Sequence, residues 1–280
     1  MDVPAYDDFL PAALREVLLA DTEPVPAVPG VRVARGLRSS FPETETDRAL
    51  AVIAEVYRRT RASLARVLEQ RRVDRAFVDD ATRSFAEANA TLDFRDPAYA
   101  TVIGRRDAAG RVVVGPTGAE RPTPRADVPT ALRGDQVTLF GPPGNARMCI
   151  HAMNALHRRR PDEPAIVSAL VEPSGMVPRW GADDEDSRTP IMASFLQAAE
   201  NLSGCYAGTL SSGDLRLTDE GRSLPIKRIP GLALPDGSHW LDGQPLPLHL
   251  VDLVLHVWRQ RHRPEALVLY VPKLENEEEA

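Results

Sequence analysis

Helix-period hydrophobic residues dominate the first part of the chain. Apolar side chains recur at spacings of three and four from Leu50 to Leu68, and a second stripe of the same kind runs from Val73 to Ala88. This periodicity predicts two amphipathic helices that pack on each other. A shorter helix is predicted for Phe9–Leu19, and the proline-rich strip Pro24–Pro29 is predicted to be an arm or linker. Residues 1–130 are therefore expected to form an N-terminal arm and helical region.

The pattern changes near Gln136, where short apolar runs begin to alternate with helix-period segments. Helices are expected to begin near Asn145, Ile191 and Pro247, and a hairpin insertion is expected at Tyr206–Thr218. Four apolar runs predict parallel strands: Gln136–Phe140, Ala165–Val171, Leu224–Ile229 and Ala266–Val271. This alternation is typical of a TIM-type β/α barrel, but a complete barrel needs eight strands and about 250 residues. Residues 131–280 are thus predicted to form an incomplete, half barrel in an α/β fold, and the chain is expected to stop inside that barrel.

Composition indicates a substantial hydrophobic core and argues against several functions. The 280 residues are 43% hydrophobic, and a net charge of −6 with a pI near 5.6 argues against a protein that binds nucleic acid or a membrane surface. Cys149 and Cys205 are too few and too far apart for a zinc site or a disulfide framework. No apolar run approaches the roughly 18 residues of a membrane span. A cytoplasmic protein is expected.

Charged residues near prolines lie at or just after the ends of the last two predicted strands. Arg228 lies at the end of one strand, and Lys273 and Glu275 follow the other. Barrel enzymes carry their working residues where strands end, so these side chains are candidates for binding or catalysis. Each also fits a structural role, Arg228 as a surface arginine in an arginine-rich chain and the other two as an ion pair at a strand end.

The same segments resemble those of a known enzyme family. Arg228-Ile-Pro-Gly-Leu-Ala-Leu-Pro235 is similar to the Arg-Pro-Arg-Gly-Trp-His-Leu-Pro pattern of the malate synthase family. Tyr270-Val-Pro-Lys-Leu-Glu275 is similar to the family's Tyr-Leu-Pro-Lys-x-Glu, and the related citrate-lyase-type aldolases also keep Pro-Lys-x-Glu. Upstream, Gly141–Ala155 resembles the family's Gly-Pro segment and the Asn-Ala-Leu-Asn helix that follows it.

The resemblance implies an enzyme that joins an acyl-CoA, acetyl-CoA in the family, to glyoxylate. It implies that Arg228 stabilises the negative oxygen of the enolate and that Lys273 and Glu275 contribute to substrate binding. Ala169-Leu-Val-Glu-Pro-Ser174 lines up with the family's Ala-Asp-Phe-Glu-Asp-Ser, which makes Ser174 a candidate contact for CoA and Glu172 a candidate at the metal site. A lone Glu and Ser at a strand end also fit a solvated loop.

Several polar residues of the family patterns are replaced in this chain. Leu170 and Pro173 stand where the family has aspartates, Pro230 stands in place of an arginine, and Ala233 in place of a histidine. These changes predict a co-substrate that is larger or less polar than glyoxylate.

The resemblance also places parts of the active site outside the segments that match. It implies that Mg²⁺ is held by a glutamate and an aspartate on later barrel strands, and that an aspartate of a C-terminal domain is the general acid/base. One hypothesis is therefore the N-terminal half of a split enzyme, completed by a second polypeptide that carries the C-terminal half of the barrel. The alternative is a non-catalytic scaffold or binding subunit derived from the family. A truncated piece of a longer gene product is a third possibility.

Three further segments invite a functional interpretation. Gly141–Asn145 opens a helix and could offer N–H groups to a phosphate, but it lacks the Gly-Lys-Ser/Thr ending of a P-loop, so a strand-to-helix turn is favoured. Asp183–Asp186 lacks the ligand spacing of an EF-hand and is predicted to be a solvated loop and helix start. His249 and His256 share one face of an apolar helix without a third ligand, so they are predicted to be packed or partly exposed.

Overall fold

The computed structural model describes residues 6, 10–88, 109–110, 138–155, 162, 164–166, 179–186, 191–219, 222–275 and 279. Two four-stranded sheets organise these residues, one parallel and one antiparallel, and a two-stranded hairpin accompanies them. The hairpin, β5 (Ser211–Ser212) with β6 (Leu215–Arg216), lies inside the predicted insertion. The fold is mixed α/β, as the alternation of periods predicts.

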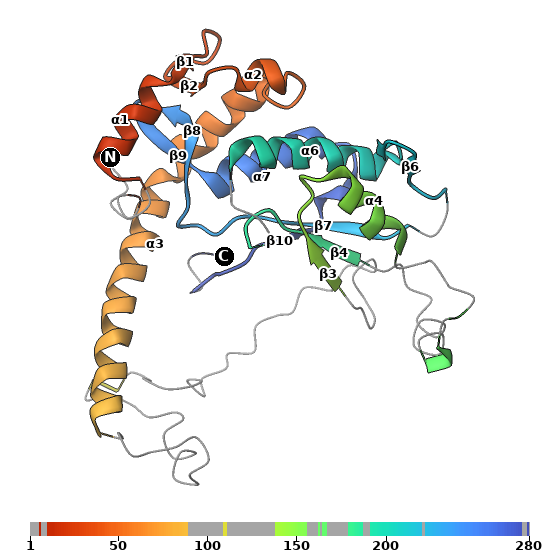
Figure 1. Ribbon diagram of the computed structural model, residues 1–280. Helices are drawn as coiled ribbons and strands as arrows, with labels where there is room; N and C mark the ends of the chain where they lie inside the picture. Colours follow the sequence, from red (N-terminus) through yellow and green to blue (C-terminus); the bar gives the residue numbers. More distant parts are fainter. Residues whose placement is uncertain are drawn as a thin grey trace.

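Neighbouring strands in the parallel sheet follow the order of the chain. The strands are β3 (Thr138–Gly141), β4 (Arg179–Ala182), β7 (Leu224–Arg228) and β10 (Leu269–Tyr270), and each pairs in parallel with the next. Three helices alternate with them in the sequence: α4 (Ala146–Ala155), α6 (Met192–Ala207) and α7 (Leu248–Gln260). All three helices lie on the same face of the sheet (Figure 1). The sheet therefore has one face packed under helices and an opposite face, which we call the inner face.

The second strand of this sheet is not the one that the sequence predicts. Ala165 and Ile166, at the start of the predicted strand Ala165–Val171, are helical, and the rest of that run lies outside the described residues. The strand in this place is β4, whose Trp180 is 1% exposed and donates its indole N–H to Met153 Sδ at 3.3 Å. The prediction failed because a short apolar run fits a helical segment as well as a strand.

Helix α3 (Asp47–Ala88) is one continuous helix of 42 residues, where the sequence predicts a packed pair. No glycine or proline occurs between its ends, so nothing stops the helix between the two apolar stripes. Leu50, Ile53 and Leu68 of its first part are buried. Val73 is 54% exposed, and from about there the helix extends away from both sheets (Figure 1).

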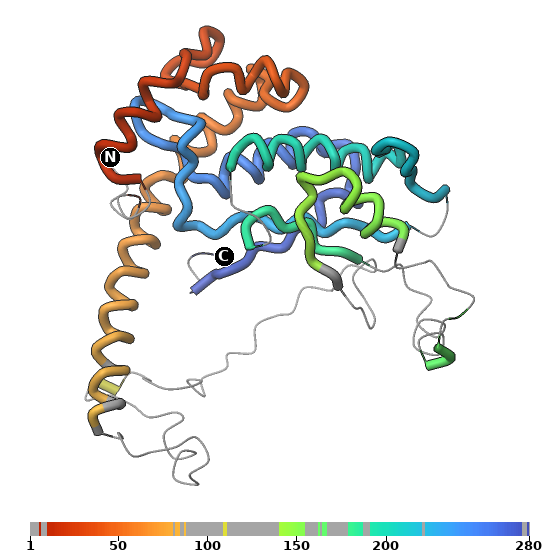
Figure 2. Tube along the Cα trace, viewed as in Figure 1, coloured from red at the N-terminus to blue at the C-terminus, as the bar shows by residue number. Residues whose placement is uncertain are grey.

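The antiparallel sheet joins strands from the two ends of the chain. Its order is β1 (Thr22–Pro24), β2 (Val31–Ala34), β8 (Pro235–Leu241) and β9 (Gln244–Pro247), with Val33 paired to His239. Figure 2 shows the hairpin β8–β9, in blue, against the red and orange N-terminal segment. Helices α1 (Ala12–Ala20) and α2 (Leu37–Ser40) flank this sheet, and α1 confirms the predicted first helix. The predicted boundary near residue 130 lies outside the described residues, but regions on both sides of it share this sheet.

Two turns close the antiparallel sheet. Between β1 and β2, Val25 and Val28 are 2% and 5% exposed, so the strip predicted to be an arm or linker is a packed turn. Between β8 and β9, Asp242 and Gly243 have φ values of 52° and 79°. Two consecutive left-handed residues, with glycine second, are what a tight two-residue hairpin requires.

A buried histidine fastens the segment before α3 to β8. His239 is fully buried and lies between two carboxylates, with Nδ1 2.5 Å from Asp236 Oδ2 and Nε2 2.9 Å from Glu45 Oε2. Burial alone would lower the pKa of His239, but Glu45 and Asp236 outweigh it and raise the pKa to about 10. The imidazolium is therefore the stable form at neutral pH, and it bridges the two segments.

None of the helices in the described part of the chain is long and apolar enough to cross a membrane. The 3₁₀ turn Pro264–Leu267 precedes β10 and buries Ala266, which accounts for the shorter observed strand within the predicted run Ala266–Val271.

Candidate functional site at the strand ends

The carboxyl ends of the parallel strands bring charged residues of three segments together. Arg228 is the last residue of β7, Asp183–Asp186 follow β4, and Lys273 follows β10. Because β7 lies between β4 and β10 in a parallel sheet, these three ends meet at one edge. We call Asp183, Glu185, Asp186, Arg228 and Lys273 the strand-end cluster.

Arg228 projects from the inner face of the sheet. It pairs in register with Tyr270, so the two side chains share a face, and its Cζ lies 5.9 Å from the centroid of the Tyr270 ring. The preceding residue, Lys227, points to the helices, where its Nζ lies 5.4 Å from the ring centroid of Phe195 in α6. The alternation along β7 thus sends one cation to the inner face and the other under the helices.

Carboxylates of the segment after β4 hold the Arg228 guanidinium in place. Its Nη1 donates to Asp183 Oδ2 and lies 2.5 Å from Asp186 Oδ2, while Nη2 lies 3.9 Å from Glu185 Oε2. Burial lowers the pKa of Arg228, but the hydrogen bonds to Asp186 and Asp183 outweigh it and raise the pKa. The side chain is 7% exposed, so this arginine is a fixed, permanently charged group.

Lys273 approaches the same carboxylates from β10. Its Nζ donates to Glu185 Oε1 at 2.6 Å and to Asp186 Oδ1 at 3.0 Å. The hydrogen bond to Glu185 raises the pKa of Lys273, and hydrogen bonds from Lys273 and then Arg228 lower the pKa of Asp186. Lys273 has a left-handed φ of 57°, which is uncommon outside glycine and turns the side chain toward the cluster. The Gly231 N–H adds a bond to Glu185 Oε2 at 2.9 Å.

A buried ion pair lies behind the cluster, on the helix side of the sheet. Lys227 Nζ is 2.9 Å from Asp252 Oδ2 in α7 and 3.8 Å from Asp184 Oδ2. All three side chains are at most 4% exposed. Burial raises the pKa of Asp184 to about 7 and also raises the pKa of Asp252, against the opposing effect of Lys227 in both cases. This pair anchors β7 to α7 directly beneath Arg228.

The structure brings together two of the residues singled out from the sequence, Arg228 and Lys273, which share Glu185 and Asp186 as partners. Glu275 instead lies 3.5 Å from Arg71 Nη1 of α3. The candidate residues Glu172 and Ser174 lie outside the described residues.

Asp183–Asp186 is a correction to the sequence prediction of a solvated loop and helix start. Asp183 and Asp184 are 3% and 2% exposed, and within the residues that the structure describes the next helix, α6, begins at Met192. Four consecutive acids are usually hydrated unless cations are brought to them from elsewhere, and here Arg228 and Lys273 come from the neighbouring strands. The sequence did carry a sign that these acids belong to the site. Ala182-Asp-Asp-Glu-Asp-Ser187 matches the malate synthase family's Ala-Asp-Phe-Glu-Asp-Ser motif at more positions than Ala169–Ser174 does.

The remaining predictions concern residues outside the cluster. At Gly141–Asn145, Asn145 Oδ1 accepts the Met148 N–H at 3.2 Å, and the Pro143 carbonyl accepts the Asn201 amide at 2.7 Å, as expected for a packed strand-to-helix turn. His256 is buried, with Nε2 2.8 Å from the Ala266 carbonyl, and burial lowers the pKa values of both His249 and His256 to about 4. The prediction of packed histidines is confirmed.

The described residues do not by themselves fit the metal that the resemblance implies. Carboxylate oxygens are the ligands that Mg²⁺ prefers, but Asp183, Glu185 and Asp186 already bond Arg228 or Lys273. Among the residues that the structure places, no group of three or more His, Cys, Asp or Glu could hold a metal ion. The cluster as it stands is a pair of cations held by three carboxylates of the same chain.

Comparison with known proteins does not assign the chain to a family: no protein-family model matches it, and a search of curated proteins finds no match.

Proposed function

We propose that this chain supplies the helical N-terminal region and the first half of a malate-synthase-like β/α barrel. The barrel would condense an acyl-CoA, such as acetyl-CoA, with glyoxylate or a related oxo acid, releasing a hydroxy acid and free CoA. The observation that carries the proposal is Arg228, held on the inner face at the carboxyl end of β7 beside Lys273. In barrel enzymes this is the end at which the reacting groups meet.

Arg228 suits the stabilisation of a developing enolate or alkoxide oxygen. Its orientation is fixed by Asp183, whose side chain is 4% exposed, so little reorganisation is needed when charge develops. Asp186 is 55% exposed, and an incoming substrate oxygen would displace this partner. Lys273, 48% exposed, would then bind a carboxylate of the oxo acid.

The order of the strands supports the barrel part of the proposal. Successive parallel strands that neighbour each other in chain order, with helices on one face, are the arrangement of a TIM-type barrel. Four such strands make half of one, and a complementary polypeptide would add the C-terminal half, the Mg²⁺ ligands and the acid/base. Asp183–Asp186 is the better counterpart of the family's acidic motif, so the proposal does not depend on the roles near metal and CoA that the resemblance gives to Glu172 and Ser174.

The alternative proposal is a scaffold or binding subunit without catalysis. It is favoured by the engagement of Arg228 and Lys273 with carboxylates of the same chain, which satisfies both cations without a substrate. Pro230 and Ala233, in place of polar family residues, favour it as well, unless the co-substrate is larger or less polar than glyoxylate.

Thiol release from acetyl-CoA distinguishes the two. The complex purified through a tag on this chain, supplied with Mg²⁺ and a series of 2-oxo acids, should release CoA. Arg228→Lys keeps the charge but loses the planar fork, so kcat should fall on the order of 10²-fold with a smaller effect on KM. The exposed Arg59→Lys in α3 is the matched control and should leave both constants unchanged.

Equal rates in wild type and Arg228→Lys would remove Arg228 from the mechanism. No thiol release with any oxo acid would favour the scaffold.

A further inference from the structure

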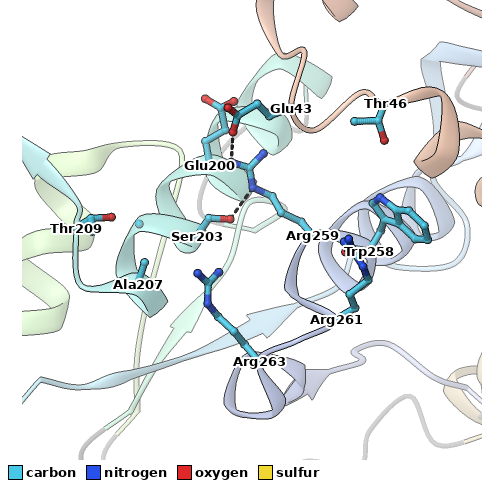
Figure 3. A pocket seen from close by; sticks show the side chains of 11 residues that line it. Glu43, Thr46, Glu200, Ser203, Ala207, Thr209, Trp258, Arg259, Arg261 and Arg263 are labelled. Carbon is cyan, nitrogen blue, oxygen red and sulfur yellow. Dashed lines mark hydrogen bonds and ion pairs between the residues drawn. The ribbon is translucent and has the colours of Figure 1, made fainter.

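A pocket of about 540 Å³ lies on the helix side of the molecule (Figure 3). Three segments form its wall: the loop before α3, the last turns of α6, and the end of α7 with the turn that follows. The side chains that matter here are Arg259, Arg261, Arg263, Ser203, Glu43 and Glu200. Both α6 and α7 end where the chain turns back to the amino end of a parallel strand, so the pocket lies at the end of the sheet opposite Arg228.

The charge of this pocket differs from that of the chain. The chain carries −6 overall, but three arginines line the pocket against two glutamates. The arginines come from one short segment, Arg259–Arg263, at alternate positions. A concave wall with an excess of positive charge concentrates anions.

Buried groups orient two of these arginines. Gln260 is 1% exposed, donates its amide N–H to Ser203 Oγ at 2.6 Å and accepts an N–H of Arg263 Nη1 at Oε1 at 3.0 Å. Ser203 Oγ also accepts the Nε–H of Arg259 at 2.6 Å. Arg259 and Arg263 are therefore tied to the buried Gln260 and the partly buried Ser203 from two sides, which reduces the ordering cost of binding a ligand between them.

The carboxylates that compete for these arginines are weak partners. Glu43 Oε2 lies 3.7 Å from Arg259 Nη2, and the Glu43 side chain is 83% exposed, so the pair contributes little and an anion can displace it. Arg261 Cζ lies 4.6 Å from the centroid of the Trp258 ring, so a cation–π contact holds the third arginine at the wall of the pocket.

We propose that this pocket binds a small molecule through a phosphate group, with Arg263 and Arg259 as the contacting cations. A guanidinium presents paired N–H donors that match two phosphate oxygens. Free phosphate and a phosphate monoester share this chemistry. The pocket is remote from the strand-end cluster, so the proposal stands or falls independently of the proposed enzyme activity.

The competing explanation is that the arginines only complement the negative end of α7, as basic residues at helix C-termini commonly do. That explanation predicts a loss of stability on substitution and no phosphate binding. Binding measurements therefore separate the two.

Isothermal titration of the full chain with inorganic phosphate, at low ionic strength with chloride at matched concentration, provides the test. We expect saturable binding at one site. Arg263→Gln should weaken it about tenfold to hundredfold, the range for loss of one charged hydrogen-bonding group. Glu200→Gln should strengthen it, because a repelling carboxylate is removed. Arg72→Gln, which removes one exposed arginine of α3, is the matched control and should leave it unchanged.

AMP in place of phosphate distinguishes the sources: tighter binding than phosphate identifies a monoester, and equal or weaker binding identifies the free ion. If Arg263→Gln does not fold, Arg263→Lys retains the charge and should still weaken binding through loss of the fork. An absence of saturable phosphate binding in wild type would overturn the proposal, and so would equal weakening by Arg263→Gln and Arg72→Gln.

Discussion

Phe140 and Tyr270 contact each other across the parallel sheet although they lie on its two outer strands, with ring centroids 6.2 Å apart and planes inclined at 67°. In a flat sheet three strand spacings, roughly 14 Å, would separate them. The sheet therefore curls toward its inner face. Gly181 permits the contact, because an added Cβ would lie 2.3 Å from two atoms of the Phe140 ring.

Substitution of Gly181 by alanine should therefore expel the Phe140 ring. We expect Gly181→Ala to lower the free energy of unfolding by about 1 kcal/mol, the scale of a lost aromatic pair and a crowded contact, measured by urea unfolding. Gly141→Ala, in the adjoining strand, is the control, because nothing lies within 4 Å of its added Cβ. In a Phe140→Leu background the cost of Gly181→Ala should shrink. An equal cost in both backgrounds would rule out the ring as the cause.

The same two rings predict how the isolated chain behaves. Phe140 and Tyr270 are 49% and 46% exposed on the inner face, on the two strands that form the edges of the parallel sheet within the described residues. Exposed apolar surface next to open strand edges favours association. We expect concentration-dependent self-association in sedimentation velocity, reduced in Phe140→Ser/Tyr270→Ser. A monomer at all concentrations, with a sharp thermal transition, would argue against the need for a complementary half.

Loss of the Lys227 charge should destabilise the fold strongly. Lys227→Met leaves the buried carboxyls of Asp184 and Asp252 without their cation, which should cost on the order of 3–5 kcal/mol at pH 8. The cost should be smaller at pH 5, because burial raises the pKa of Asp184 to about 7, so that this carboxyl takes up a proton there, and burial raises the pKa of Asp252 as well. Lys273→Met, the change at the half-exposed lysine, should cost less than about 1 kcal/mol. Similar costs for the two variants would contradict a buried pair.

Alkaline pH should weaken the junction at His239. The folded pKa of about 10 lies above the value of about 6.5 expected in the unfolded chain, so the stabilisation is complete below pH 6.5 and is lost as pH rises through 10. Between pH 7 and 10 the free energy of unfolding of wild type should fall more steeply than that of His239→Gln. The exposed His262→Gln should follow wild type. Parallel curves for wild type and His239→Gln would show that His239 is not charged in the folded protein.

The sequence predicted the individual helices and strands whose formation depends on neighbouring residues. The helix over Ala12–Ala20, the strand over Leu224–Arg228 and the start of α7 near Pro247 follow from period, proline position and run length. The prediction of two helices over α3 was wrong, because a shift of the apolar stripe does not end a helix when neither glycine nor proline interrupts it. The hairpin β8–β9 was not predicted, although Asp242-Gly243 is a known turn pair.

The candidate site could be predicted only in part. Arg228 and Lys273 were found because each ends a strand, but their partners depend on which strands become neighbours, and that is a property of the whole sheet. Asp183–Asp186 is predicted to be a solvated loop because it lacks the spacing of an EF-hand, and nothing in the local sequence shows that Arg228 and Lys273 meet it. Arg71 as the partner of Glu275 joins α3 to the segment after β10, and neither segment carries a local sign of the other.

The antiparallel sheet has a consequence for synthesis. β1 and β2 leave the ribosome early, but their partner β8 follows about two hundred residues later, since Val33 pairs with His239. Until β8 emerges, the apolar side chains of Val31 and Val33 have no sheet to cover them. Contacts between such distant residues form slowly because a long loop must close first. The final folding step of β1 and β2 must therefore follow translation of the β8–β9 hairpin.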